Sequence, residues 1–191
     1  NVTMIQMITG FCSLLNGGNY YEPHMVSRIV SQDGSTVQTI EPRVLKQTIS
    51  PSVSDTIIDY CNGVVTEGTG TTARPAGYAI GGKTGTAETQ PRDNNEYVVS
   101  FMGYAPADDP QIAIYVVVDR PNVKDQDNAK FATRLVRSIL TEALPYLGIF
   151  MTEEVTEEEQ EELDALQLEN TNYYRQQAVS GNDVLPEETG E

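Results

Sequence analysis

The longest unbroken apolar run of the chain, from Ile112 to Val118, is only seven residues long. A helix that crosses a membrane needs about 20 apolar residues, so this run is too short to span a bilayer. A strand that is apolar at every position is typical of a sheet that is covered on both faces. We therefore predict a strand over Gln111–Asp119 that lies in the middle of a buried sheet.

Two further strands precede this run, and a long helix follows it. We expect strands over Tyr78–Glu88 and Tyr97–Tyr104, and the short connections favour antiparallel neighbours. Apolar residues then recur at helical spacing from Ala132 to Leu147, which predicts an amphipathic helix of about five turns. Such a helix most simply packs on one face of the sheet. The order of elements predicts an α+β fold.

The first 50 residues predict a helix and a hairpin. Thr3 and Gln6 have the spacing of a capping box, which marks the start of a helix. Further on, Asp33-Gly34 separates two apolar segments, Met25–Val30 and Thr36–Ile40. This arrangement is a hairpin signal.

The two cysteines, Cys12 and Cys61, both fall in predicted helices among apolar neighbours. The second of these helices begins after Ser52 or Ser54 as its cap. We expect buried free thiols in preference to one disulfide. The cysteines do not form a metal-ligand pair, and His24 is the only histidine. A zinc site or a Ser-His-Asp triad within this chain is therefore disfavoured.

The acidic charge is concentrated at one end of the chain. The whole chain has 28 acidic and 12 basic residues, for a net charge of −16. Residues 152–191 hold 13 of the acidic residues and a single basic one, Arg175. Nucleic-acid binding needs concentrated Lys and Arg, so a nucleic-acid partner is excluded.

The acidic segment reads as a tail. Thr156 with Glu159 forms a second capping-box pattern, and Glu157–Leu168 is expected to form a short helix. We divide the chain into a domain over residues 1–150 and a tail over residues 151–191 that is partly helical or disordered. The tail has little apolar periodicity, so few core contacts are expected.

The segment from Gly77 to Thr84 fits G-x-x-x-x-G-K-T, the pattern of a phosphate-binding loop. That loop needs a buried strand before its first glycine and a helix that opens at the Lys-Thr pair. Here Arg74-Pro75-Ala76 precedes the segment and Gly85 directly follows it. A P-loop ATPase is therefore the weaker alternative.

Read as a strand, the same residues contain K-T-G at Lys83-Thr84-Gly85. K-T-G is the third element of a serine acyl-transfer set that also contains S-x-x-K and S-D-N. Val64-Val-x-x-Gly68-Thr-Gly70 and Gly77-Tyr78 precede it, and Ser100-Phe101-x-Gly103-x-Ala105-Pro106 follows it. In this order the motifs resemble the C-terminal half of the transpeptidase domain of penicillin-binding proteins of the monofunctional class B type. The resemblance covers about residues 2–150.

The resemblance implies a serine D,D-transpeptidase that cross-links peptidoglycan through an acyl-enzyme on D-Ala-D-Ala stem peptides and that binds β-lactams. Such enzymes serve cell division, elongation or sporulation. They sit on the extracytoplasmic face of the membrane, here anchored by a segment outside this chain. The implied fold is that of β-lactamases and transpeptidases, incomplete because upstream strands and helices are missing. No metal or organic cofactor is implied. The competing class is a non-catalytic scaffold module that keeps the fold.

The resemblance also implies roles for four residues. Lys83 would supply a fixed positive charge that orients the polar groups of the site and attracts the substrate's terminal carboxylate. The hydroxyls of Thr84 and Thr86 would hydrogen-bond this carboxylate, and Gly85 would leave room for the incoming backbone. The backbone N–H of Thr86 would be one of two oxyanion donors. The catalytic candidates are thus Lys83 and Thr86, and all four residues are substrate-binding candidates.

The first two elements of the acyl-transfer set are missing. None of the ten serines begins S-x-x-K, and the one S-x-N, Ser180 to Asn182, follows K-T-G where the family places it before. The chain begins with Asn1 and looks like a fragment. We therefore expect the nucleophile, its lysine and the S-x-N element in an upstream half of the same domain. On this reading the chain alone is inactive.

Overall fold

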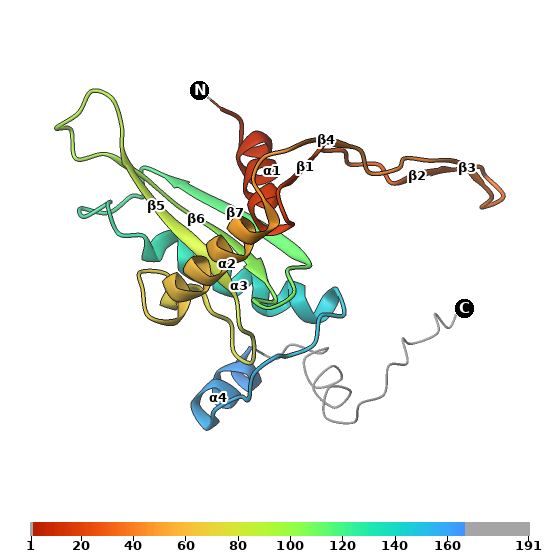
Figure 1. Cartoon of the computed structure of the whole chain (residues 1–191). Coiled ribbons are helices and arrows are strands. Elements are labelled where there is room, and N and C mark those ends of the chain that lie inside the picture. Colours follow the sequence, from red (N-terminus) through yellow and green to blue (C-terminus); the bar gives the residue numbers. More distant parts are fainter. Residues whose placement is uncertain (1, 167–191) are drawn as a thin grey trace.

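The structure of the chain is a computed structural model that describes residues 2–166 (Figure 1). Its helices are α1 (Met4–Leu15), α2 (Pro51–Thr66), a short 3₁₀ helix (Thr71–Ala73), α3 (Lys130–Tyr146) and α4 (Glu157–Ala165). Its strands are β1 (Asn19–Tyr21), β2 (Arg28–Val30), β3 (Thr36–Thr39), β4 (Val44–Gln47), β5 (Gly81–Glu88), β6 (Tyr97–Ala105) and β7 (Ile112–Asp119).

The central sheet has three antiparallel strands, in the order β5-β6-β7. Helices lie on both of its faces (Figure 1). α2 contacts β5 and α1 contacts β7 on one side, and α3 packs against β6 and β7 on the other. The predicted α+β fold with an antiparallel sheet is confirmed. None of the helices in residues 2–166 has the length and apolarity that a bilayer crossing requires.

The prediction that the apolar strand lies in the middle of its sheet is wrong for the described residues. β6 is the middle strand, and β7 lies at an edge. Alternate residues of β7 pack against the core beneath α3, and α1 contacts β7 as well. A continuous apolar run therefore reports that both faces of a strand are covered. It carries no information about which neighbours the strand has along its edges.

The main core lies between the sheet and α3. Val136, Leu140 and Leu144 of α3 are almost completely buried there. The other members of this cluster are Val65, Ala73, Tyr78, Ile80, Phe101, Ala105, Ala132 and Ile149. The predicted apolar stripe of α3 is wider than the face that is buried, because Leu135 and Ile139 are 49% and 47% exposed. α3 therefore has a second apolar flank that residues 2–166 leave open.

The helix starts follow capping rules. Thr3 and Gln6 form the predicted capping box of α1. α2 is capped by Ser50, so the prediction of Ser52 or Ser54 is wrong. Pro51 occupies the first helical turn, where its missing N–H costs nothing. Ser54 instead joins α2 to α1: its buried hydroxyl donates a hydrogen bond of 2.7 Å to the carbonyl of Leu14.

Residues 19–47 form a narrow ribbon that extends away from the sheet (Figure 1). The predicted hairpin is present as β2 paired with β3, with Gly34 at a positive φ in its turn. The sequence did not predict β1 and β4, whose pairing carries this hairpin outward. His24 lies on the ribbon and is exposed, and Arg43 forms an exposed ion pair of 2.7 Å with Glu22.

The segment that follows α3 packs on the residues that lead into β5. The hydroxyl of Tyr78 donates a hydrogen bond of 2.9 Å to the carbonyl of Ile149. The backbone N–H of Thr152 donates to the carbonyl of Gly77, and the hydroxyl of Thr152 accepts from the N–H of Ala79, both at 2.9 Å. These contacts fix the approach to the strand that carries K-T-G.

α4 is also attached to the domain. It begins with the predicted capping box of Thr156 and Glu159. Its Leu163 is 5% exposed. Ion pairs join it and the preceding residues to the domain: Arg74 with Glu153 at 2.6 Å, Arg74 with Glu159, and Arg137 with Glu162.

The apolar contacts of residues 151–166 come from Met151, which packs against the main core, and from the buried Leu163, and the ion pairs add contacts at the surface. The division of the chain at residue 150 stays a prediction. The predicted helix end at Leu168 and the segment from Ser180 to Asn182 lie outside the described residues.

Candidate active site

The K-T-G motif lies within β5, which pairs with β6 along its whole length. Lys83 is opposite Met102, and Thr86 is opposite Val99. No helix begins at Lys83, so the geometry that a phosphate-binding loop requires is not formed there. β5 has only one neighbouring strand within residues 2–166, so its other edge presents backbone N–H and C=O groups that an extended peptide can pair with.

The start of β5 is tightly packed. Gly81 and Gly82 are buried. A Cβ atom on Gly81 would collide with the ring of Tyr104, and one on Gly82 would lie 2.6 Å from the carbonyl oxygen of Met102 and collide with the ring of Phe101. Only glycine fits these positions. Burial raises the pKa of Tyr104, and its hydroxyl donates to Asn62 of α2 at 2.7 Å.

The four predicted site residues follow directly, and they are half-buried or exposed. Successive side chains of a strand point to opposite faces of the sheet. Lys83 shares the face of Met102, which packs with α1 and α2, while Thr84 shares the face of Phe101, which packs with α3. Side chains of the motif therefore lie on both faces of the sheet beside the open edge of β5.

The Lys83 ammonium lies on the α2 side. Its Nζ donates a hydrogen bond of 2.7 Å to the backbone carbonyl of Thr84. Burial raises the pKa of the Cys61 thiol on α2, and the charge of Lys83 partly opposes this shift. Both cysteines are free thiols. The ammonium is exposed, so it can meet an anion at the strand edge.

Thr69 is a neighbour of the candidate site that our sequence prediction did not include. Its hydroxyl oxygen lies 2.8 Å from the hydroxyl oxygen of Thr84, although 15 residues separate the two in the chain. The only signal in the sequence was its place between Gly68 and Gly70, a pattern that we used for the family resemblance alone. Thr86, by contrast, is exposed on the same strand face as Thr84.

Arg74 and Glu88 flank the motif in sequence, but both have other partners. Arg74 forms ion pairs with Glu153 and Glu159. A carboxylate oxygen of Glu88 accepts a hydrogen bond of 2.6 Å from the backbone N–H of Asp93, in the loop between β5 and β6. Both residues therefore act as surface charges, which is the commoner role of charged side chains.

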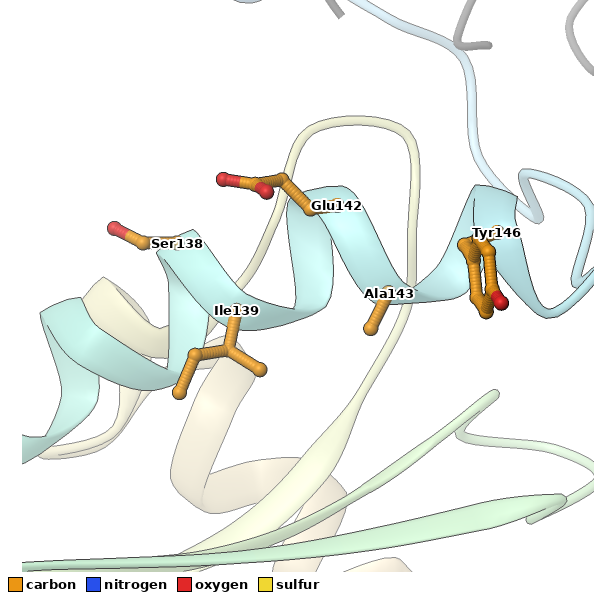
Figure 2. A pocket seen from close by; sticks show the side chains of 5 residues that line it. All are labelled: Ser138, Ile139, Glu142, Ala143 and Tyr146. Atoms are coloured by element: carbon orange, nitrogen blue, oxygen red, sulfur yellow. The ribbon is translucent and has the colours of Figure 1, made fainter.

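A concave surface is lined by α3 and by none of the K-T-G residues. Figure 2 shows the five side chains that line it, all from one helix: Ser138, Ile139, Glu142, Ala143 and Tyr146. Apart from Glu142, they offer no charged group. Residues 2–166 contain no cluster of three or more His, Cys, Asp or Glu side chains placed to hold a metal ion. The open edge of β5 is therefore the better candidate for chemistry.

The sequence matches the family described as the penicillin binding protein transpeptidase domain over residues 1–141. The chain belongs to this family. The similarity rests on most of the chain and includes the strand that carries Lys83-Thr84-Gly85.

Among curated relatives, stage V sporulation protein D of Bacillus subtilis (strain 168) is 38% identical over 154 residues, which cover 78% of this chain and 24% of that protein. The peptidoglycan D,D-transpeptidase FtsI homolog of Mesostigma viride is 29% identical over 155 residues, which cover 73% of this chain and 26% of that protein. The chain thus spans about a quarter of the length of these relatives.

Solved structures show the same architecture. The D,D-transpeptidase domain of a peptidoglycan glycosyltransferase from Eggerthella lenta superposes with a TM-score of 0.61 at 29% identity, covering 75% of this chain and 33% of that one. The transpeptidase domain of penicillin-binding protein 3 from Burkholderia pseudomallei has a TM-score of 0.64 at 23% identity, covering 80% of this chain and 45% of that one, and supports the fold.

Proposed function

We propose that the chain is the K-T-G half of a serine D,D-transpeptidase that cross-links peptidoglycan. The observation that carries this proposal is the position of Lys83-Thr84-Gly85 at an open sheet edge, in a chain of the transpeptidase family. In the intact enzyme, a serine oxygen attacks the carbonyl carbon of the penultimate D-Ala, and the terminal D-Ala leaves as an amine. The amine of a second stem peptide then takes the acyl group.

The residues of β5 would bind and polarise the stem peptide. The exposed Lys83 ammonium attracts the terminal carboxylate, and the hydroxyls of Thr84 and Thr86 donate hydrogen bonds to it. Gly85 lets the peptide backbone approach the strand edge. The backbone N–H of Thr86 is one oxyanion donor, and a donor of this kind contributes about 10²–10³ in rate. A β-lactam presents the same carbonyl and carboxylate and would acylate the same serine.

The remaining partner is the upstream half of the same domain. The chain spans about a quarter of its curated relatives, so most of such a protein would lie outside it. The open edge of β7 and the apolar flank of α3 with its hollow (Figure 2) are surfaces that upstream strands and helices would cover. We place the anchor to the extracytoplasmic face of the membrane in the same upstream region.

Labelling with a fluorescent penicillin tests this function. The intact protein should be labelled stoichiometrically, whereas residues 1–191 alone should not be labelled, because they contain no S-x-x-K nucleophile. Co-expression of residues 1–191 with the upstream half should restore the label. A non-catalytic scaffold would leave the intact protein unlabelled, and stoichiometric labelling of residues 1–191 alone would contradict our placement of the nucleophile.

A further inference from the structure

The hydroxyl groups of Thr69 and Thr84 form a pair at the edge of the candidate site. Their oxygens are 2.8 Å apart, and either one can be the donor. Thr69 is exposed and Thr84 is half-buried. A hydrogen bond between two partly solvated hydroxyls adds little to the stability of a fold, because water competes for both groups. The stability of the fold therefore gives little reason for this pair of hydroxyls.

The position of Thr69 is nevertheless fixed by its neighbours. Gly70 donates its N–H to the carbonyl of Val64 at 2.9 Å, which closes the turn onto the end of α2. A Cβ on Gly68 would lie 2.8 Å from the same carbonyl oxygen, and a Cβ on Gly70 would lie 3.2 Å from the ring of Phe101. The two glycines thus allow a close approach that holds Thr69 in place.

The same buried residue lies beside both segments. Phe101 is completely buried. It is the residue of β6 directly opposite Thr84, and it also packs beside Gly70. The loop that carries Thr69 and the strand that carries Thr84 are therefore held by one common side chain, so their separation is set by the core.

The direction of the hydrogen bond decides what Thr84 can do. A threonine hydroxyl has one proton and can accept two hydrogen bonds. If Thr84 donates to Thr69, its proton is no longer available to a ligand. If Thr69 donates to Thr84, the proton of Thr84 is free to point to the open edge of β5. A carboxylate at that edge can only accept, so it selects the second arrangement, in which each bond polarises the next.

We propose that Thr69 is a positioning residue that holds the hydroxyl of Thr84 as a proton donor toward the carboxylate of the ligand. The inference rests on the proposed function, in which this ligand is a stem peptide or a β-lactam. It deepens that function because it names a hydroxyl outside the K-T-G motif that acts through the motif.

The test measures the second-order rate constant of acylation of the intact protein by benzylpenicillin and by its methyl ester, which lacks the anionic carboxylate. Thr69→Val removes the hydroxyl and keeps the shape of the side chain. It should slow acylation by benzylpenicillin about fivefold, the effect of one net hydrogen bond, and slow acylation by the ester less, because the neutral ester oxygen accepts a weaker hydrogen bond than a carboxylate does. Thr69→Ser should restore the wild-type rate. Thr66→Val is the matched control, because among the described contacts the hydroxyl of Thr66 bonds only to carbonyls of α2.

Two further arms keep the inference distinct from the proposed function. Thr69→Val added to Thr84→Val should slow acylation no further than Thr84→Val alone, and the melting temperature of Thr69→Val should match that of the wild type. Equal losses with the acid and the ester, or no loss with either, would overturn the role of Thr69 while the proposed function stands. A wild-type protein that benzylpenicillin does not acylate would overturn the proposed function and this inference together.

Discussion

The first two residues of β5 and the six that follow have opposite physical characters. Gly81 and Gly82 are buried beneath the rings of Tyr104 and Phe101, and no side chain fits there. From Lys83 onward the strand is half-buried or exposed. A rigid anchor, Gly81 and Gly82, and the edge that we propose as the active site are therefore adjacent on one strand. Changes to the anchor should alter stability, whereas changes to the edge should alter chemistry and leave the fold intact.

The residues just before this anchor are held by a later part of the chain that lies outside the family match. That match ends at residue 141. The segment after α3 bonds to Gly77, Tyr78 and Ala79, immediately before β5. The approach to the K-T-G strand is thus held by Ile149, at the end of the predicted domain, and by Thr152, in the segment that the sequence pattern marked as a tail.

The largest loss of stability is expected from removing this support. Truncation after Gly148 removes the buried side chains of Ile149 and Leu163. The free energy of unfolding of the intact protein should fall by about 3 kcal/mol, because each buried aliphatic side chain contributes about 1.5–3 kcal/mol. Urea denaturation measures it, with truncation after Leu166 as the matched control. Equal stability of the two truncations would show that the segment supports nothing.

A smaller loss is expected within the anchor itself. Gly82→Ala places a methyl group against the ring of Phe101 and the carbonyl of Met102, so we expect about 2 kcal/mol of destabilisation from overpacking. Gly63→Ala in α2 is the control, because a Cβ there meets no atom within 4 Å. That control should be stabilising by up to about 1 kcal/mol. Thermal unfolding of both variants decides, and a neutral Gly82→Ala would contradict the anchor.

Ion pairs should contribute least to the support. Arg74 joins the domain to Glu153 and to Glu159, whose side chain is 15% exposed. Arg74→Ala should cost about 1 kcal/mol at low salt and less at high salt. Arg43→Ala removes the exposed pair with Glu22 on the ribbon and should cost less than about 0.5 kcal/mol. If the two variants are equally stable across salt concentrations, α4 is held by its apolar contacts alone.

Local patterns predicted the fold well where one physical rule decided the outcome. The capping boxes at Thr3 and Thr156 start α1 and α4 as expected. The short connection between β5 and β6 predicted their antiparallel pairing. These features depend on residues that are close in sequence or on backbone geometry that only certain residues adopt.

Apart from the cap of α2, the failures concern contacts between distant residues. α4 forms ion pairs with Arg74 and Arg137, which meet these acidic partners only in the folded chain. Thr69 reaches Thr84 because Phe101 holds both segments. Neither contact has a periodic signature, so the sequence could not predict it. The K-T-G residues could be proposed as a site because they form a contiguous motif, and that assignment stays a prediction.

The most direct test of the account is acylation of the intact protein after Lys83→Ala. Lys83 is exposed and bonds only the carbonyl of its neighbour among the described contacts, so the melting temperature should not change. The second-order rate constant for benzylpenicillin should fall about 100-fold or more, the scale expected for a lost electrostatic contact to the reacting ligand. Lys124→Ala, an exposed lysine in the loop before α3, should acylate at the wild-type rate. A Lys83→Ala protein that acylates at the wild-type rate, or that unfolds, would contradict the assignment of the strand edge as the active site.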